Sequence, residues 1–224
     1  MQQNLFTKDE ITSVSPAIAK PFVSRSTFYQ GDCLVEMDKI EDKSVDMILC
    51  DLPYGTTACK WDSVIPFMDL WRSYDRIAKD NAAIILTASQ PFTSALIMSN
   101  PKYFKYEWIW EKSRPTGTMQ KDYQPFKIHE NILVFYKKLP TYNPIKYKVD
   151  EKYRDKRKSF NAVVNTDGGQ LDSFNRVHAP DDGWRFPQTI LSFNSVWAKG
   201  MHPTQKPVEL MEYLILTYTN EGET

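Results

Sequence analysis

Short continuous apolar runs alternate along this chain with longer segments whose apolar residues have helical spacing. The runs VDMILC at 45–50 and AAIILT at 82–87 contain no regular polar alternation, which is typical of buried parallel strands. Between them, residues 66–80 favour an amphipathic helix with Ser63 as a candidate cap. The apolar positions of that helix are Phe67, Leu70, Trp71, Tyr74, Ile77 and Ala78.

Further elements are expected on both sides of this core. They are a strand at 27–29, a short helix at 34–40, a helix at 90–99 with Pro91 in its first turn, and strands at 104–110 and 131–136. Strands that alternate with helices predict an α/β fold with a largely parallel sheet.

The pattern changes after residue 136. Residues 137–158 contain nine Lys or Arg with interleaved Tyr residues, and residues 159–196 are polar and are expected to be irregular. Regular spacing returns at 203–218, where a helix is predicted with Pro207 near its first turn. Its expected apolar stripe is Val208, Met211, Ile215 and Tyr218.

Composition narrows the class of protein. The 224 residues can form a sizeable core, and 28 basic against 28 acidic residues exclude DNA binding by overall positive charge, though not by a local basic face. The three Cys and three His lack zinc-ligand spacing, so no metal site is predicted, and free thiols fit a reducing cytoplasm. The chain contains no apolar run of ~18 residues and no signal-peptide pattern. We therefore expect a protein that neither spans a membrane nor is secreted.

The segment that follows the first buried run carries the strongest chemical signal. Asp51, Leu52, Pro53 and Tyr54 lie where an α/β sheet places its ligands, at the carboxyl end of a strand. The Asp51 carboxylate and the Leu52 carbonyl can each accept a hydrogen bond from an amino group, and Tyr54 offers a ring on which a flipped base could stack. A turn in which Asp51 caps a loop and Tyr54 packs is an equally ordinary interpretation of these four residues alone.

Read with its neighbours, DLPYG after VDMILC resembles the catalytic motif of the DNA amino-methyltransferases, usually written [DNS]-P-P-[YFW]. The following Thr56, Thr57, Trp61 and Asp62 are similar to bacterial and phage members. Leu52 replaces the first Pro of the motif but keeps the carbonyl through which that position acts. EWIWEK at 107–112, PTG at 115–117 and HEN followed by ILVFYKK from 129 resemble later segments of the same family.

The resemblance implies a Rossmann-like fold and S-adenosylmethionine as the cofactor. QGDCL at 30–34 resembles the segment near the cofactor adenine, which implies roles for Asp32 and Cys33. HPTQKP at 202–207 resembles the segment that opens a helix beside the methionine end of the cofactor, and a helix N-terminus with a Lys suits a carboxylate. The implied cofactor residues are Asp32, Cys33, Asp51, His202, Pro203, Thr204 and Lys206.

The order of these segments resembles the β-type arrangement, with the catalytic motif first. It implies an arm at 1–26, a catalytic core at 27–136, a target-recognition region at 137–196 and a cofactor-side helix at 197–224. DNA contacts are expected from Lys146, Lys148, Lys152, Arg154, Lys156, Arg157 and Lys158, whose side chains would hold phosphates. A solvated charged face is the competing interpretation.

A glycine-rich cofactor loop should follow the HPTQKP helix in this order, and the eight glycines contain no G-x-G. Three explanations are open: a truncated chain, a second polypeptide or second copy that supplies the loop, or a DNA-binding module without activity. The function predicted is methyl transfer from S-adenosylmethionine to an exocyclic amino group of DNA in the cytoplasm of a bacterial or phage-infected cell. Adenine N6 is preferred, because Asp at the first motif position is more usual in adenine-N6 than in cytosine-N4 members.

Overall fold

The computed structural model describes residues 26–57, 59, 62–154, 159–165, 171–177, 181–196 and 204–224. These form two compact units, one of which contains Pro144–Pro187 and the other Arg25–Asn143 with Gln188–Thr224. The predicted arm at 1–26 lies almost entirely outside the described residues. The four segments proposed above, with their three boundaries, remain predictions.

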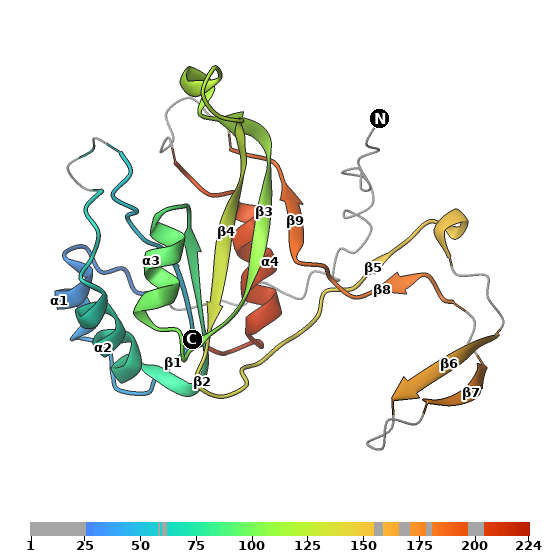
Figure 1. The fold of residues 1–224 in the computed structure, drawn as a ribbon. Coiled ribbons are helices and arrows are strands. Elements are labelled where there is room, and N and C mark those ends of the chain that lie inside the picture. Colours follow the sequence, from blue (N-terminus) through green and yellow to red (C-terminus); the bar gives the residue numbers. More distant parts are fainter. Residues whose placement is uncertain are drawn as a thin grey trace. The chain divides into compact units, whose positions relative to one another are not determined.

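The larger unit contains a five-stranded sheet in the order β1-β2-β4-β3-β9 (Figure 1). Its strands are β1 (Val45–Asp51), β2 (Ala78–Ala88), β3 (Phe104–Thr116), β4 (Lys127–Phe135) and β9 (Ile190–Phe193). β1 pairs with β2, and β3 with β9, in parallel, whereas β4 runs antiparallel to both of its neighbours. The expectation of a largely parallel sheet is therefore wrong. Apolar runs do not encode strand direction, and the short segment 117–126 joins β3 and β4 as a hairpin.

Helices cover both faces of this sheet (Figure 1). Ile84 and Leu86 of β2 pack in one hydrophobic cluster with α1 (Cys33–Met37), α2 (Phe67–Ile77) and α3 (Phe92–Ser99). Ala83 and Ile85 point to the opposite face and pack in a second cluster with α4 (Val208–Tyr218). Successive side chains of a strand point to opposite faces, so the continuous apolar run in β2 is explained by burial on both sides. The α/β class is confirmed.

Several element boundaries differ from the sequence-based expectation. Residues 27–29 form no strand, because Phe28 and Tyr29 are exposed and gain no burial that would hold them in one. The N-cap of α2 is Pro66, without a side-chain cap from Ser63. α2 ends at Ile77, because the next residues join β2, where Ala78 is paired with Val45.

The C-terminal part of the chain also differs. Residues 159–196 are not irregular, because β9 and three further strands lie within them. The buried side of α4 is formed by Leu210, Leu214 and Tyr218, whereas Val208 and Ile215 of the predicted stripe are exposed. This helix is apolar nearly all round, so spacing alone could not select its buried face.

The smaller unit contains two antiparallel sheets of two strands each. β5 (Tyr147–Lys148) pairs antiparallel with β8 (Trp184–Arg185), and β6 (Ser159–Asn165) pairs antiparallel with β7 (Leu171–Val177). A 3-10 turn, η3 (Glu151–Tyr153), follows β5, and Asp150 caps it by accepting a hydrogen bond from the Lys152 amide.

Candidate active site at the end of the first strand

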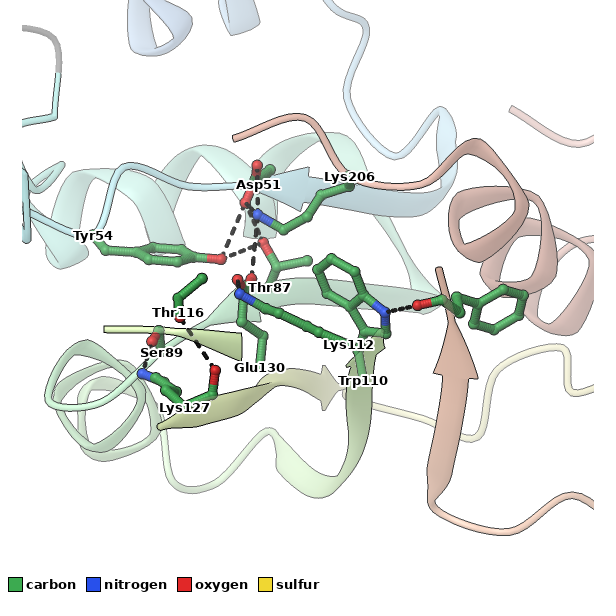
Figure 2. A network of polar contacts seen from close by, with 11 residues as sticks. Asp51, Tyr54, Thr87, Ser89, Trp110, Lys112, Thr116, Lys127, Glu130 and Lys206 are labelled. Atoms are coloured by element: carbon green, nitrogen blue, oxygen red, sulfur yellow. Dashed lines mark hydrogen bonds and ion pairs between the residues drawn. The ribbon is translucent and has the colours of Figure 1, made fainter. Parts of the chain in front are cut away.

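Asp51 is the last residue of β1 and lies beside Thr87 of β2, its register partner. Its carboxylate oxygen Oδ1 accepts hydrogen bonds from the Thr87 hydroxyl and from Lys206 Nζ at 2.8 Å (Figure 2). The Tyr54 hydroxyl lies 3.1 Å from Oδ1 and 2.9 Å from Thr87 Oγ1, and with one hydrogen it donates to one of them at a time. Oδ2 accepts a hydrogen bond from Lys206 Nζ at 2.9 Å. A carboxylate oxygen has two lone pairs, so Oδ2 has capacity for a further donor.

A second acidic residue joins this network. Lys206 Nζ lies 3.3 Å from Glu130 Oε2 of β4, an ion pair without hydrogen-bond geometry, and the other oxygen of Glu130 pairs with Lys112 of β3. The side chains of Lys112, Glu130 and Lys206 are 10%, 13% and 9% exposed. With Asp51, whose side chain is 40% exposed, they form a set of two cations and two carboxylates whose charges balance, as the burial of the other three requires.

The Tyr54 ring is packed on one side. It stacks on Phe92 with a centroid separation of 5.3 Å and an interplanar angle of 24°, and Lys206 Nζ lies 5.5 Å from its centroid. Burial, together with the charges of Asp51 and Glu130, raises the pKa of Tyr54, so this hydroxyl remains a donor at physiological pH. Phe92 thus covers one face of the ring, and Lys206 lies over the ring as well.

The loop after Tyr54 is closed by its own acidic residue. The Asp62 carboxylate accepts hydrogen bonds from the backbone N–H groups of Gly55, Thr56 and Thr57 at 2.9, 2.9 and 2.7 Å. Burial alone would raise the pKa of Asp62, but the hydroxyl of Thr57 and these N–H groups outweigh burial and lower the pKa to about 2. The loop geometry is thus held by a carboxylate that stays ionised.

Two other residues explain why the loop takes this path. Leu52 is 5% exposed and lies in the cluster of α1, α2 and α3, so its side chain anchors the loop where the family motif has Pro. Gly55 has φ of +67°, and a Cβ at this position would lie 2.9 Å from a methyl of Val64. Both the backbone conformation and the space available therefore require glycine at position 55.

The predicted cofactor residues are only partly brought together. Asp32 caps α1 by accepting a hydrogen bond from the Leu34 amide at 2.9 Å, and Cys33 is exposed. Burial raises the pKa of the Cys50 thiol, which lies one position before Asp51. Lys206 contacts Asp51, Thr204 is exposed, and His202 and Pro203 lie outside the described residues.

Three members of the site were not singled out from the sequence: Thr87, Lys112 and Glu130. Thr87 lies at the end of the AAIILT run, and parallel neighbours end at the same edge of a sheet, so its position beside Asp51 was accessible to inference. Glu130 belongs to the HEN segment, but its contact with Lys206 depends on the antiparallel direction of β4. His129 of the same segment is exposed.

The predicted DNA-binding residues lie in the smaller unit. Lys146 and Lys148 are exposed, and their ammonium groups lie 4.4 Å from the ring centroid of Phe186 and 5.9 Å from that of Trp184. Lys152 lies 4.8 Å from the Tyr153 ring, whereas Arg154 is half-buried, with its Nε close to where a Cβ of Gly183 would lie. Lys156, Arg157 and Lys158 lie outside the described residues.

The described part of the chain contains no group of three or more His, Cys, Asp or Glu positioned to hold a metal ion. None of its helices combines the length and the apolar character needed to cross a membrane.

Comparison with known families gives one match over most of the chain. Residues 45–224 match the family model described as DNA methylase, of the N6/N4 type. The matched range contains all six residues of the polar network, Asp51, Tyr54, Thr87, Lys112, Glu130 and Lys206.

Among characterised proteins, the DNA adenine methyltransferase YhdJ of Escherichia coli (strain K12) is 26% identical over 210 residues, which cover 88% of this chain and 68% of that protein. The type II methyltransferase M1.MboII of Moraxella bovis is 27% identical over 217 residues, covering 87% of this chain and 80% of its own length.

Two solved structures show the same fold at low sequence identity. The cytosine-N4-specific PvuII DNA methyltransferase has a TM-score of 0.57 at 11% identity, over 87% of this chain and 71% of its own. A complex of M1.HpyAVI with S-adenosylmethionine has a TM-score of 0.50 at 18% identity, over 87% of this chain and 78% of its own.

Proposed function

The chain belongs to the family of N6/N4 DNA methyltransferases, and we propose that it transfers a methyl group from S-adenosylmethionine to an exocyclic amino group of a base flipped against Asp51 and Tyr54. The observation that carries the proposal is the polar network at the end of β1, in which both Asp51 oxygens accept from Lys206 and Oδ2 has a second lone pair for a further donor. Adenine N6 is the proposed target, supported by the Asp at position 51 and by the adenine specificity in the name of YhdJ. The relatives named above come from bacteria, which supports the proposal that the chain acts on DNA in the cytoplasm of a bacterial or phage-infected cell.

Asp51 and Leu52 would orient the target amino group. One N–H donates to Asp51 Oδ2 and the other to the Leu52 carbonyl, which leaves the nitrogen lone pair free to attack. The nitrogen becomes positively charged as it reacts, and the Asp51 carboxylate stabilises that charge in a site partly shielded from water. S-adenosylmethionine, when bound, would supply the methyl group from its sulfonium: the S–C bond breaks as the N–C bond forms, the thioether leaves, and the amino nitrogen then gives up one proton to solvent.

Lys206 fits the carboxylate of this cofactor. An ammonium group has three donors, and two of the Lys206 contacts go to Asp51, which leaves a third donor for Glu130 or for a ligand carboxylate. A cation in contact with Asp51 opposes the stabilisation of positive charge on the base. Glu130 offers Lys206 a second acceptor, so Lys206 can move away from Asp51 without losing an ionic partner.

The smaller unit is proposed to contact DNA through Lys146, Lys148 and Lys152, which are exposed and close to aromatic rings. Ammonium groups can hold phosphates while the adjacent rings stack on bases. Replacing Lys146 and Lys148 by Gln should weaken DNA binding and reduce the slope of log affinity against log salt by about 2, one for each phosphate contact. An unchanged slope would identify these residues as an ordinary solvated face.

The proposed activity is tested with labelled S-adenosylmethionine and mixed-sequence duplex DNA, followed by identification of the methylated nucleoside. Asp51→Asn keeps the side-chain shape but removes the charge, and it should lower kcat by about 10³-fold. Asp69→Asn, at a surface pair with Arg72, is the matched control and should leave kcat unchanged.

Calorimetric binding of S-adenosylmethionine is measured in parallel. Transfer by the parent chain that persists in Asp51→Asn would remove Asp51 from the mechanism. If the parent chain shows no methyl transfer and no cofactor binding, the alternative of a DNA-binding module without activity is favoured. Detection of N4-methylcytosine instead of N6-methyladenine would show that the target base is cytosine and would leave the proposed methyl transfer standing.

A further inference from the structure

The hairpin between β3 and β4 exposes large apolar side chains. Residues 117–126 form its tip, which includes the 3-10 turn η2 (Thr118–Gln120). Within this tip Met119 is 95% exposed, Tyr123 90% and Phe126 47%. Backbone bonds from Gln120 to Gly117 and from Tyr123 to Gln120 fold the tip, so it has a structure of its own without burying these side chains.

The tip lies at the catalytic edge of the sheet. β3 and β4 are paired as far as Thr116 and Lys127, and Lys127 Nζ donates a hydrogen bond to Ser89, just after β2 (Figure 2). Glu130, three residues beyond Lys127, already belongs to the Asp51 network. Figure 1 shows the tip at the same end of the sheet as the loop that follows β1.

Charge near the tip favours an anionic partner. Residues 114–128, which exclude the Lys112 paired with Glu130, contain three basic side chains (Arg114, Lys121 and Lys127) and one acidic one (Asp122), a difference of two positive charges. Basic groups beside exposed apolar and aromatic groups match nucleic acid, whose phosphates flank stacked bases.

From these observations we propose that the tip is a wedge that enters the base stack of duplex DNA beside the flipped base, with Met119 and Tyr123 as the inserted side chains. The proposal rests on the DNA methyltransferase function stated above. Extrusion of a base leaves a gap in the stack and costs a few kcal/mol of stacking and pairing. Apolar side chains that fill the gap recover part of that cost, in the way that minor-groove proteins insert Met or Phe between base steps.

Binding to a duplex that already contains a gap tests the wedge without knowledge of the recognition sequence. Fluorescence anisotropy compares two labelled duplexes of one sequence, one intact and one with a central abasic site. The parent chain should bind the abasic duplex about tenfold more tightly, since stacking on a side chain contributes about 1–3 kcal/mol per base. The double variant Met119→Ser/Tyr123→Ser should lose this preference and keep the thermal stability of the parent, because both side chains are exposed.

Met68→Ser/Met98→Ser is the matched control, since it removes two side chains that are 87% and 72% exposed on α2 and α3. This control should retain the preference. Equal binding of both duplexes by the parent chain, or an unchanged preference in the Met119/Tyr123 variant, would overturn the wedge.

Methyl-transfer assays distinguish a failure of the wedge from a failure of the proposed methyltransferase activity. Where the parent chain methylates DNA, its target is mapped and then presented either paired or mismatched. The Met119/Tyr123 variant should be slow on the paired target and close to parental rate on the mismatched one, whose extrusion costs less. Equal slowing on both substrates contradicts the wedge. Abasic preference without methyl transfer would leave the wedge supported and the proposed activity wrong.

Discussion

Two loops at the same edge of the sheet differ in whether their residues are buried and hydrogen-bonded or exposed to solvent. The loop from Asp51 to Asp62 turns inward: Leu52 is buried, and three successive N–H groups bind the Asp62 carboxylate. The hairpin tip at 117–126 turns outward and leaves Met119 and Tyr123 in solvent. Preorganisation suits a loop that holds reacting groups, because a carboxylate and a carbonyl must meet one amino group in a set geometry. Exposed apolar groups suit a surface that gains its contacts only when DNA arrives.

The largest expected effect on stability is at Asp62. Asp62→Ala removes the acceptor of three N–H groups and should lower the free energy of unfolding by about 3 kcal/mol, because hydrogen bonds to a charged group contribute more than neutral ones. It should also reduce kcat about 100-fold by releasing Tyr54 and Asp51 from their geometry. Urea unfolding and methyl-transfer kinetics measure the two effects.

Asp62→Glu and Asp122→Ala complete that test. Asp62→Glu should recover part of both losses, since it keeps the charge, and Asp122→Ala at the tip should change neither quantity. Full activity in Asp62→Ala would show that the closed loop is not needed for the chemistry.

A pair of glycines isolates the packing difference between the loops. Gly55→Ala should cost about 2 kcal/mol and Gly117→Ala about 1 kcal/mol, because both adopt positive φ and each pays the left-handed penalty. The excess at position 55 comes from the Val64 methyl, whereas nothing lies within 4 Å of a Cβ at position 117. Equal costs in urea unfolding would mean that Val64 moves aside freely.

Tyr54→Phe separates the hydroxyl of Tyr54 from its ring. The ring keeps its stacking on Phe92, and the loss of one donor to Thr87 or Asp51 should cost about 1 kcal/mol, or about fivefold in kcat. Steady-state kinetics should show no change in KM for the cofactor. A loss as large as that of Asp51→Asn would assign the hydroxyl a direct chemical role.

The last test is the pH dependence of stability, which is confined to a narrow acidic window. The folded-state pKa of Asp62, about 2, lies below its ordinary value of 3.8, so its contribution is complete above about pH 4 and is lost as the pH falls to 2. The urea midpoint of the parent should therefore decline across this window more steeply than that of Asp62→Asn. Parallel declines in the two proteins would show that other carboxylates dominate acid unfolding.

Part of the fold could be predicted from the sequence, because some elements are specified by their own local pattern of apolar and polar residues. The runs at 45–50 and 82–87 became β1 and β2, paired in parallel, because uninterrupted apolar residues are stable only where both faces of a strand are covered. α2 was predicted with its buried side, since its polar and apolar positions segregate strongly. The apolar stripe of α4 was wrong because that helix offers apolar residues on nearly every side.

By itself, the sequence determined the family and three members of the site, Asp51, Tyr54 and Lys206, because motif residues carry their chemistry in their identity and spacing. Only the tertiary structure decided that Lys206, 155 positions along the chain, binds the Asp51 carboxylate and shares it with Tyr54 and Thr87. It also decided that antiparallel β4 brings Glu130 to Lys206 and that Phe92 covers one face of Tyr54. Strand direction and helix rotation result from burial summed over the whole core, so no local pattern contains them.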